Sequence, residues 1–245
     1  MKGNWLKNNA NKDFFSEYDL DYSNRKADAE EWGPKYVRER LIALYNSKYR
    51  AICSIAYLTA SRISEVCLLK KRDVRYDAAE NLFWFTIKTE KRRDGHRKRI
   101  PVNPNNNEEV LFALGFVATY LSKLPENLDP DAYLFGDPGI FQTKRTFEIH
   151  KAKNQKEGLP KEYATKIYND NRMRHRVYNF VMKKAGFNPH LLRHARLSYL
   201  AHANKEQYKG HDRMLLIKSL ADFTKLESAE SYLRDMTDTE KKNVF

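Results

Sequence analysis

From residue 34 onward, apolar side chains recur every three or four positions, the spacing of a helix that buries one face. The pattern predicts two helices before residue 58, an amphipathic helix over 108–123, and a helix over 172–185 that ends at Gly186. Asn188-Pro189 then begins another helix. The inward positions expected in the first three helices are Val37, Leu41, Leu44, Ile52, Ile55, Leu58, Val110, Leu111, Leu114, Val117 and Leu121.

One segment has the composition of a strand. Residues 82–87 are β-branched and aromatic, and Asp94-Gly95 is a strong hairpin signal. Residues 99–102 are the expected returning strand, and residues 125–142 are loop-rich. The predicted fold class is therefore mainly α with a small β-hairpin or sheet (α+β).

Composition divides the chain into three parts. Residues 1–33 are rich in Asn, Asp and Lys with scattered aromatic side chains, which predicts an N-terminal arm or linker. A boundary at Gly33-Pro34 opens a folded domain over 34–234, and 235–245 form a polar C-terminal tail.

The chain is strongly basic, with 45 Lys and Arg against 32 Asp and Glu and a formal net charge of +13. Residues 1–33 contain five basic and seven acidic side chains, so the excess lies downstream of them. This surplus favours a polyanion binder, because neutralising phosphates releases counterions. A highly charged, solvated surface is the alternative.

Two stretches concentrate the positive charge. The predicted hairpin carries seven basic side chains over 88–99, and residues 143–176 contain ten Lys and Arg against four Asp and Glu. Both suit contact with a phosphate backbone, although solvated faces look similar in sequence. The candidate DNA-binding residues are Lys91, Arg92, Arg93, Arg97, Lys98, Arg99, Lys144 and Arg145.

Cys53 and Cys67 lie inside apolar helical patterns, which predicts buried core thiols rather than a disulfide or a metal site. No apolar run reaches eighteen residues and no secretory signal is visible. We expect a cytoplasmic or other intracellular location and no membrane partner.

The first candidate chemistry lies in Asn188-Pro189-His190-Leu191-Leu192-Arg193-His194. His190 and Arg193 are three apart and share one helical face. An Arg forks onto two phosphate oxygens, and a His exchanges protons near neutral pH. Arg62 is a second candidate, although an ion pair with Glu65 explains it equally well.

These residues resemble the tyrosine recombinase/integrase family, relatives of the type IB topoisomerases. The resemblance rests on Ala60-Ser61-Arg62-Ile63-Ser64-Glu65, on His190-Leu191-Leu192-Arg193-His194, and on Ser228-Ala229-Glu230-Ser231-Tyr232. It covers roughly residues 34–234, which the family uses as a catalytic DNA breaking and rejoining domain.

The resemblance implies a site-specific recombinase or integrase of a mobile element, with Tyr232 as nucleophile and a 3′-phosphotyrosine intermediate. Arg62 and Arg193 would stabilise the charge on the phosphate. Lys88, with Lys91 as the alternative, would protonate the leaving 5′ oxygen, and His190 would assist the nucleophile. No metal or other cofactor is implied. The implied partners are double-stranded DNA and further copies of the chain. We expect the protein to be a monomer in solution and to assemble into a tetramer on DNA.

Two departures from the family pattern favour an alternative. Nine residues before Tyr232, where the family has His or Trp, stands Phe223, which can pack but cannot donate a hydrogen bond. Such a donor is worth on the order of 3 kcal/mol. The family usually has a helical DNA-clamping domain before the catalytic one, whereas residues 1–33 are too few and not basic, so either the chain is a catalytic fragment or it relies on a partner or a minimal arm. The alternative is a catalytically weakened DNA-binding accessory protein on the same fold, and a topoisomerase that only relaxes supercoils shares the chemistry.

Overall fold

The computed structural model of the chain describes residues 34–89, 97–104, 108–149, 162–203, 215, 217 and 218. Its α+β architecture confirms the predicted fold class. The helices are α4 (Pro34–Ala43), α5 (Ser47–Leu58), α6 (Ile63–Cys67), α7 (Glu108–Leu121), α8 (Arg172–Ala185) and α9 (His190–Ala203), with a 3-10 turn η1 (Lys71–Asp73). The strands are β1 (Val74–Asp77), β2 (Leu82–Lys88), β3 (Arg97–Val102), β4 (Ile140–Ile149) and β5 (Glu162–Asn171).

Helix α5 lies at the centre of the core. All residues from Ala51 to Leu58 are buried, as expected for a helix with neighbours on every side. Helices α4, α6, α7 and α9 all pack against it. The Asn46 side chain begins the helix by accepting a hydrogen bond from the Tyr49 N–H at 3.2 Å.

No helix of the described residues is long and apolar enough to span a membrane.

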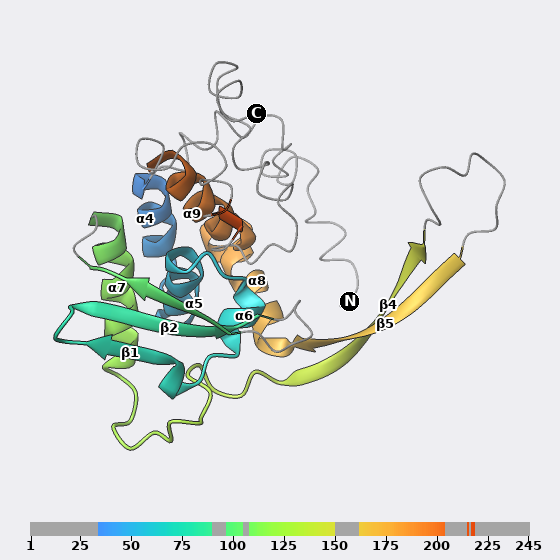
Figure 1. The fold of residues 1–245 in the computed structure, drawn as a ribbon, viewed down its shortest axis with the longest axis horizontal. Coiled ribbons are helices and arrows are strands. Elements are labelled where there is room, and N and C mark those ends of the chain that lie inside the picture. The colour runs from blue at the N-terminus through green and yellow to red at the C-terminus, as the bar shows by residue number, and fades with distance from the viewer. Residues whose placement is uncertain are drawn as a thin grey trace, which may run out of the picture.

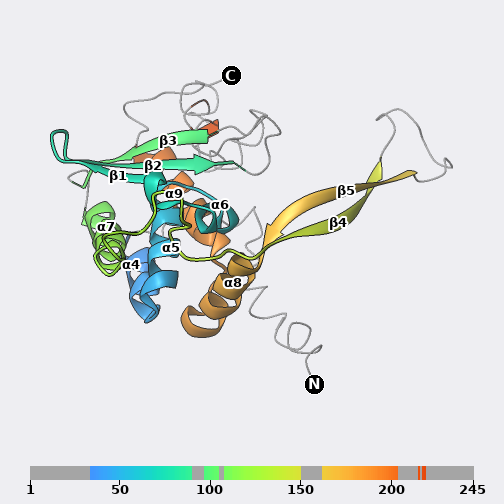
Figure 2. The same cartoon turned by 90° about the horizontal axis from the view of Figure 1, so that it is seen from below.

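Strands β1, β2 and β3 form an antiparallel sheet in that order. The sheet lies as a layer beside the helices (Figure 2). Phe85 pairs with Ile100, and both are buried, whereas Lys88 pairs with Arg97 at the exposed end. The predicted hairpin is therefore present, and its tip, residues 90–96, lies outside the described residues.

Strands β4 and β5 form a second sheet that the sequence did not predict. Each has ten residues, and their register runs from Ile140 opposite Asn171 to Ile149 opposite Glu162. Both views show this two-stranded ribbon extending away from the body (Figures 1 and 2). The pattern was missed because polar residues occupy both faces of the ribbon, so no apolar alternation marks it.

The root of the ribbon is fixed to α6 and α8. The Asn171 side chain donates to the Ser64 carbonyl at 3.3 Å and accepts from the Arg174 N–H at 2.7 Å. Asp170, which is buried, accepts two hydrogen bonds of 3.0 Å from the Arg174 guanidinium. The arm therefore has a rigid attachment although most of its length projects outward.

Two helix boundaries match the sequence prediction closely. Helix α8 ends at Gly186, whose φ of 66° is left-handed and suits a residue without a Cβ. Helix α9 begins after Asn188, whose side chain accepts from the His190 N–H at 2.9 Å. One inward assignment was wrong: Leu111 in α7 is 56% exposed.

Candidate active site

Arg62 stands directly before α6, in the turn that follows α5. Its guanidinium forms an ion pair with Glu65 at 2.6 Å, and its backbone N–H donates to the second oxygen of that carboxylate at 2.9 Å. The Glu65 side chain is 0% exposed and that of Arg62 is 17% exposed. The ion pair considered from sequence is therefore present, and it holds Arg62 in place. A guanidinium has five N–H donors, so this pairing leaves donors for a phosphate.

Arg193 is buried in the first turn of α9. Its guanidinium donates a hydrogen bond to the carbonyl oxygen of Ala60, 133 positions earlier in the chain. Ala60 has a φ of 49°, the left-handed conformation that an alanine adopts only at a cost. The two predicted arginines thus come from segments that touch: Arg193 binds the turn in which Arg62 stands.

His190 lies on the same helix, one turn before His194. The two imidazole rings meet edge to face, with centroids 4.7 Å apart. His190 is half-buried. The predicted pair of His190 and Arg193 therefore sits at the N-terminal end of α9, beside the Ala60 turn.

The hairpin lysines are placed differently from one another. Lys88, the predicted proton donor, is exposed at the end of β2, and its alternative Lys91 lies outside the described residues. Lys98 on β3 directs its ammonium to the Thr59 carbonyl at 3.4 Å. From the sequence, Lys98 was predicted to contact DNA only. It pairs with the buried Ile87 across the hairpin, and this pairing was the signal that could have predicted its contact with the Thr59 turn.

The remaining predicted DNA-binding residues fall into three groups. Arg97 forms an ion pair with the buried Asp73, and Arg99 lies over the Trp84 ring at 4.0 Å. Lys144 is exposed on β4, and the register places Arg145 opposite Lys166. The predicted residues outside the described part of the chain are Lys91, Arg92, Arg93, Phe223 and Tyr232.

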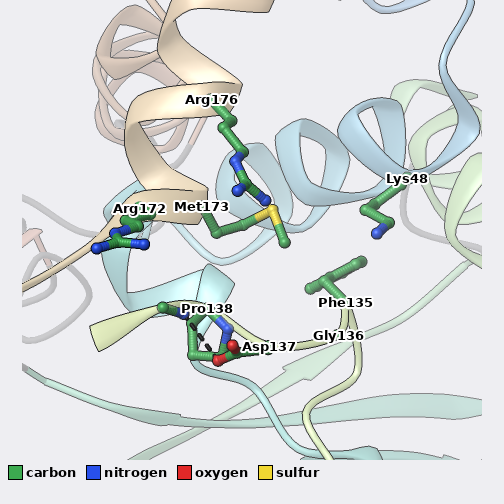
Figure 3. Close-up of a pocket in the computed structure, with 9 residues that line it drawn as sticks. Lys48, Phe135, Gly136, Asp137, Pro138, Arg172, Met173 and Arg176 are labelled. Atoms are coloured by element: carbon green, nitrogen blue, oxygen red, sulfur yellow. Dashed lines mark hydrogen bonds between the residues drawn. The ribbon is translucent and has the colours of Figure 1, made fainter. Parts of the chain in front are cut away.

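A cavity of about 300 Å³ lies at the root of the ribbon. Lys48 reaches it from α5, and Arg172 and Arg176 reach it from α8 (Figure 3). Lys48 is at the start of α5 and the Arg62 turn follows its end. The other side of the cavity lies close to that turn, because Arg172 follows Asn171, whose side chain donates to the Ser64 carbonyl. The spacing of Arg172 and Arg176, one helical turn apart, is the sequence signal that was overlooked.

The two cysteines are buried free thiols, as the sequence predicted. Burial raises the pKa of the Cys53 thiol, which therefore stays protonated at neutral pH. Both cysteines belong to the core cluster.

No protein-family model matches the chain, and a search of curated proteins finds no match. Among solved structures, the chain is similar to the XerH site-specific recombinase bound to difH substrate in a pre-cleavage complex. The TM-score is 0.51 and the sequence identity 11%, and the match covers 86% of this chain and 51% of that chain. The XerH post-cleavage complex with palindromic difH gives TM-score 0.51 and 12% identity over 86% and 50% of the two chains. The XerA recombinase gives TM-score 0.45 and 18% identity over 86% and 59%.

The chain therefore has a tyrosine recombinase-like fold, as the resemblance implied. It spans about half the length of the XerH chains.

Proposed function

We propose that this protein breaks and rejoins double-stranded DNA as a site-specific recombinase, through a 3′-phosphotyrosine on Tyr232. The observation that carries the proposal is the hydrogen bond from Arg193 to the Ala60 carbonyl, which joins α9 to the turn of Arg62. Two guanidinium groups held in neighbouring segments suit the two non-bridging oxygens of one phosphodiester.

In the proposed reaction, the Tyr232 hydroxyl oxygen attacks phosphorus and forms a phosphate ester. The bond from phosphorus to the 5′ oxygen breaks, and the DNA end departs as a 5′ hydroxyl. The phosphotyrosine keeps the energy of the broken bond, so the reverse attack by a 5′ hydroxyl rejoins DNA without a nucleotide or metal cofactor. Arg62 and Arg193 stabilise the negative charge that grows on the phosphate during each attack.

Two proton transfers accompany these steps. His190, half-buried beside Arg193, assists removal of the proton from the Tyr232 hydroxyl. Lys88, exposed at the end of β2, gives a proton to the 5′ oxygen, with Lys91 as the alternative donor. The Lys98 ammonium holds the Thr59 carbonyl and so positions the turn that carries Arg62.

The solved relatives support DNA as the substrate. Both XerH structures are complexes with difH substrate, one before and one after cleavage. The net charge of +13 has the sign that such a substrate requires. We further propose that the protein is intracellular, acts on mobile-element DNA, and assembles from monomers into a tetramer on that DNA.

Single-turnover cleavage of a nicked duplex tests the role of the arginine pair. Arg193→Ala and Arg62→Ala are expected to slow cleavage about 100-fold or more, because each removes a donor to the transition-state charge. Arg75→Ala, which removes an exposed arginine on β1, is the matched control and retains the wild-type rate. DNA binding without any cleavage by the wild-type chain would instead identify an accessory DNA-binding protein.

A further inference from the structure

The β4–β5 ribbon is an extended element that the proposed reaction does not use. Ten residues per strand span about 34 Å at the usual rise, close to one turn of a DNA duplex. Within the described part of the chain, its sheet consists of these two strands alone. A lone two-stranded hairpin is marginally stable in water, so a ribbon of this length gains stability from a partner along it.

One face of the ribbon carries exposed apolar side chains around a lysine. Tyr163 is 61% exposed, and Ile167, which lies opposite Lys144 in the register, is 59% exposed. Ile140 continues the same face toward the root. Exposed apolar groups beside a cation match a DNA groove, where apolar side chains contact thymine methyl groups and lysines contact phosphates.

The charges of the ribbon favour DNA over a second copy of the chain. Strands β4 and β5 contain three Lys and Arg and three Asp and Glu, and residues 150–161, which join them in the sequence and lie outside the described residues, add four Lys and one Glu. Exposed lysines on both strands, Lys144 and Lys166, oppose edge-to-edge pairing with a second copy.

Three cationic side chains lie at the root of the ribbon. Lys48, Arg172 and Arg176 line the root cavity, and among the described residues none of these three forms an ion pair. Asp137 also lines the cavity, with its carboxylate accepting from the Gly139 N–H at 2.9 Å. Because Asn171 and Asp170 fix the root to α6 and α8, a duplex gripped by the arm is held at a defined angle to the body.

We propose that the β4–β5 ribbon is a DNA-binding arm that enters the major groove of the duplex away from the cleavage point. A two-stranded β-ribbon fits this groove. The inference rests on the proposed DNA-rejoining function for its ligand, and it assigns to that function a second contact, along the ribbon that leaves the body at α6 and α8.

The test uses the full chain and fluorescence anisotropy with two labelled duplexes, one of about 12 and one of about 40 base pairs, over a range of salt. Lys144→Ala, on the same face as Ile167, is expected to weaken binding to the long duplex about fivefold and to reduce the salt slope by about 0.9, the value for one lost phosphate contact. Ile167→Ala is expected to weaken binding about threefold with an unchanged slope, because it removes an apolar contact.

Lys123→Ala is the matched control, since it removes one exposed lysine from the body. An equal effect of this control, or wild-type binding by Lys144→Ala, overturns the proposal. Loss of binding in Lys144→Ala without an effect of Ile167→Ala overturns groove insertion. A change in the mass of the DNA-free protein in sedimentation, caused by the ribbon variants, identifies self-association instead.

Covalent capture on a nicked duplex keeps this inference separate from the proposed function. At saturating protein, the ribbon variants are expected to form as much adduct as wild type, because the ribbon lies outside the reacting groups. If the wild-type protein forms no adduct, the proposed catalysis is wrong. The anisotropy measurements of DNA binding then still test the role of the ribbon.

Discussion

Glu65 accepts two hydrogen bonds from Arg62, one from its backbone N–H and one from its guanidinium. The same carboxylate therefore begins helix α6 and orients the arginine that we assign to the phosphate. A single buried acid links the stability of the turn to the chemistry of the site.

Replacement of Glu65 separates these two roles. Glu65→Ala is expected to lower the free energy of unfolding by about 3 kcal/mol, because it leaves a mostly buried Arg62 without its partner. Glu65→Gln keeps an acceptor for the Arg62 N–H and is expected to cost about 1 kcal/mol. Urea unfolding of both variants measures the difference, and equal losses would contradict the double role.

Ala60 is predicted to tolerate glycine better than any larger residue. Glycine relieves about 1 kcal/mol of left-handed strain, and the greater freedom of the unfolded chain offsets a similar amount. Ala60→Gly is therefore expected to leave the free energy of unfolding within about 0.5 kcal/mol of wild type. Ala60→Val adds a β-branched side chain in this buried conformation and is expected to cost about 2 kcal/mol or more. Chemical denaturation decides the order, and a larger loss for glycine would refute it.

Replacement of Lys88 and replacement of Lys98 are predicted to slow cleavage for different reasons. On a substrate whose leaving 5′ oxygen is replaced by sulfur, departure needs no proton. Lys88→Ala is expected to cleave ordinary DNA slowly and the sulfur substrate at the wild-type rate. Lys98→Ala is expected to be slow on both, because it disturbs the Thr59 turn rather than the proton. The opposite pattern would assign the proton to Lys98.

Asp170 is predicted to make the free energy of unfolding decrease at low pH. Burial raises its pKa, but the Asn171 N–H and the Arg174 and His175 side chains outweigh burial and bring the pKa below its ordinary value. A depressed folded pKa means that the stabilisation is complete above the unfolded value, about 3.9, and declines as pH falls through the folded value. The difference in free energy of unfolding between wild type and Asp170→Asn is expected to be constant above about pH 5 and to shrink below pH 4. A difference that persists undiminished to pH 2 would exclude this origin.

Much of the helical fold could be predicted because burial imposes a period on the sequence. Helix α8 matches its prediction at both ends, since Gly186 marks its stop. Strands β2 and β3 were visible because β-branched and aromatic residues flank a turn signal. The ribbon could not be found in the same way, because strands that project from the body need no apolar face to bury.

The candidate site was predictable in its residue types more than in its contacts. The spacing of His190 and Arg193 indicated a shared face, but the pairing of Arg193 with Ala60 spans 133 positions. Local patterns carry no information on such a separation. The position of Lys98 against Thr59 likewise depends on how the sheet lies on the helices.

The most direct test of the account is covalent capture on a nicked duplex that traps the cleaved strand, followed by mass-spectrometric mapping of the modified peptide. The wild-type protein is expected to form an adduct whose nucleotide is attached to Tyr232. Tyr232→Phe is expected to bind the same DNA and to form no adduct. An adduct that persists in Tyr232→Phe, or wild-type protein that binds the duplex and never becomes attached to it, would contradict the central claim.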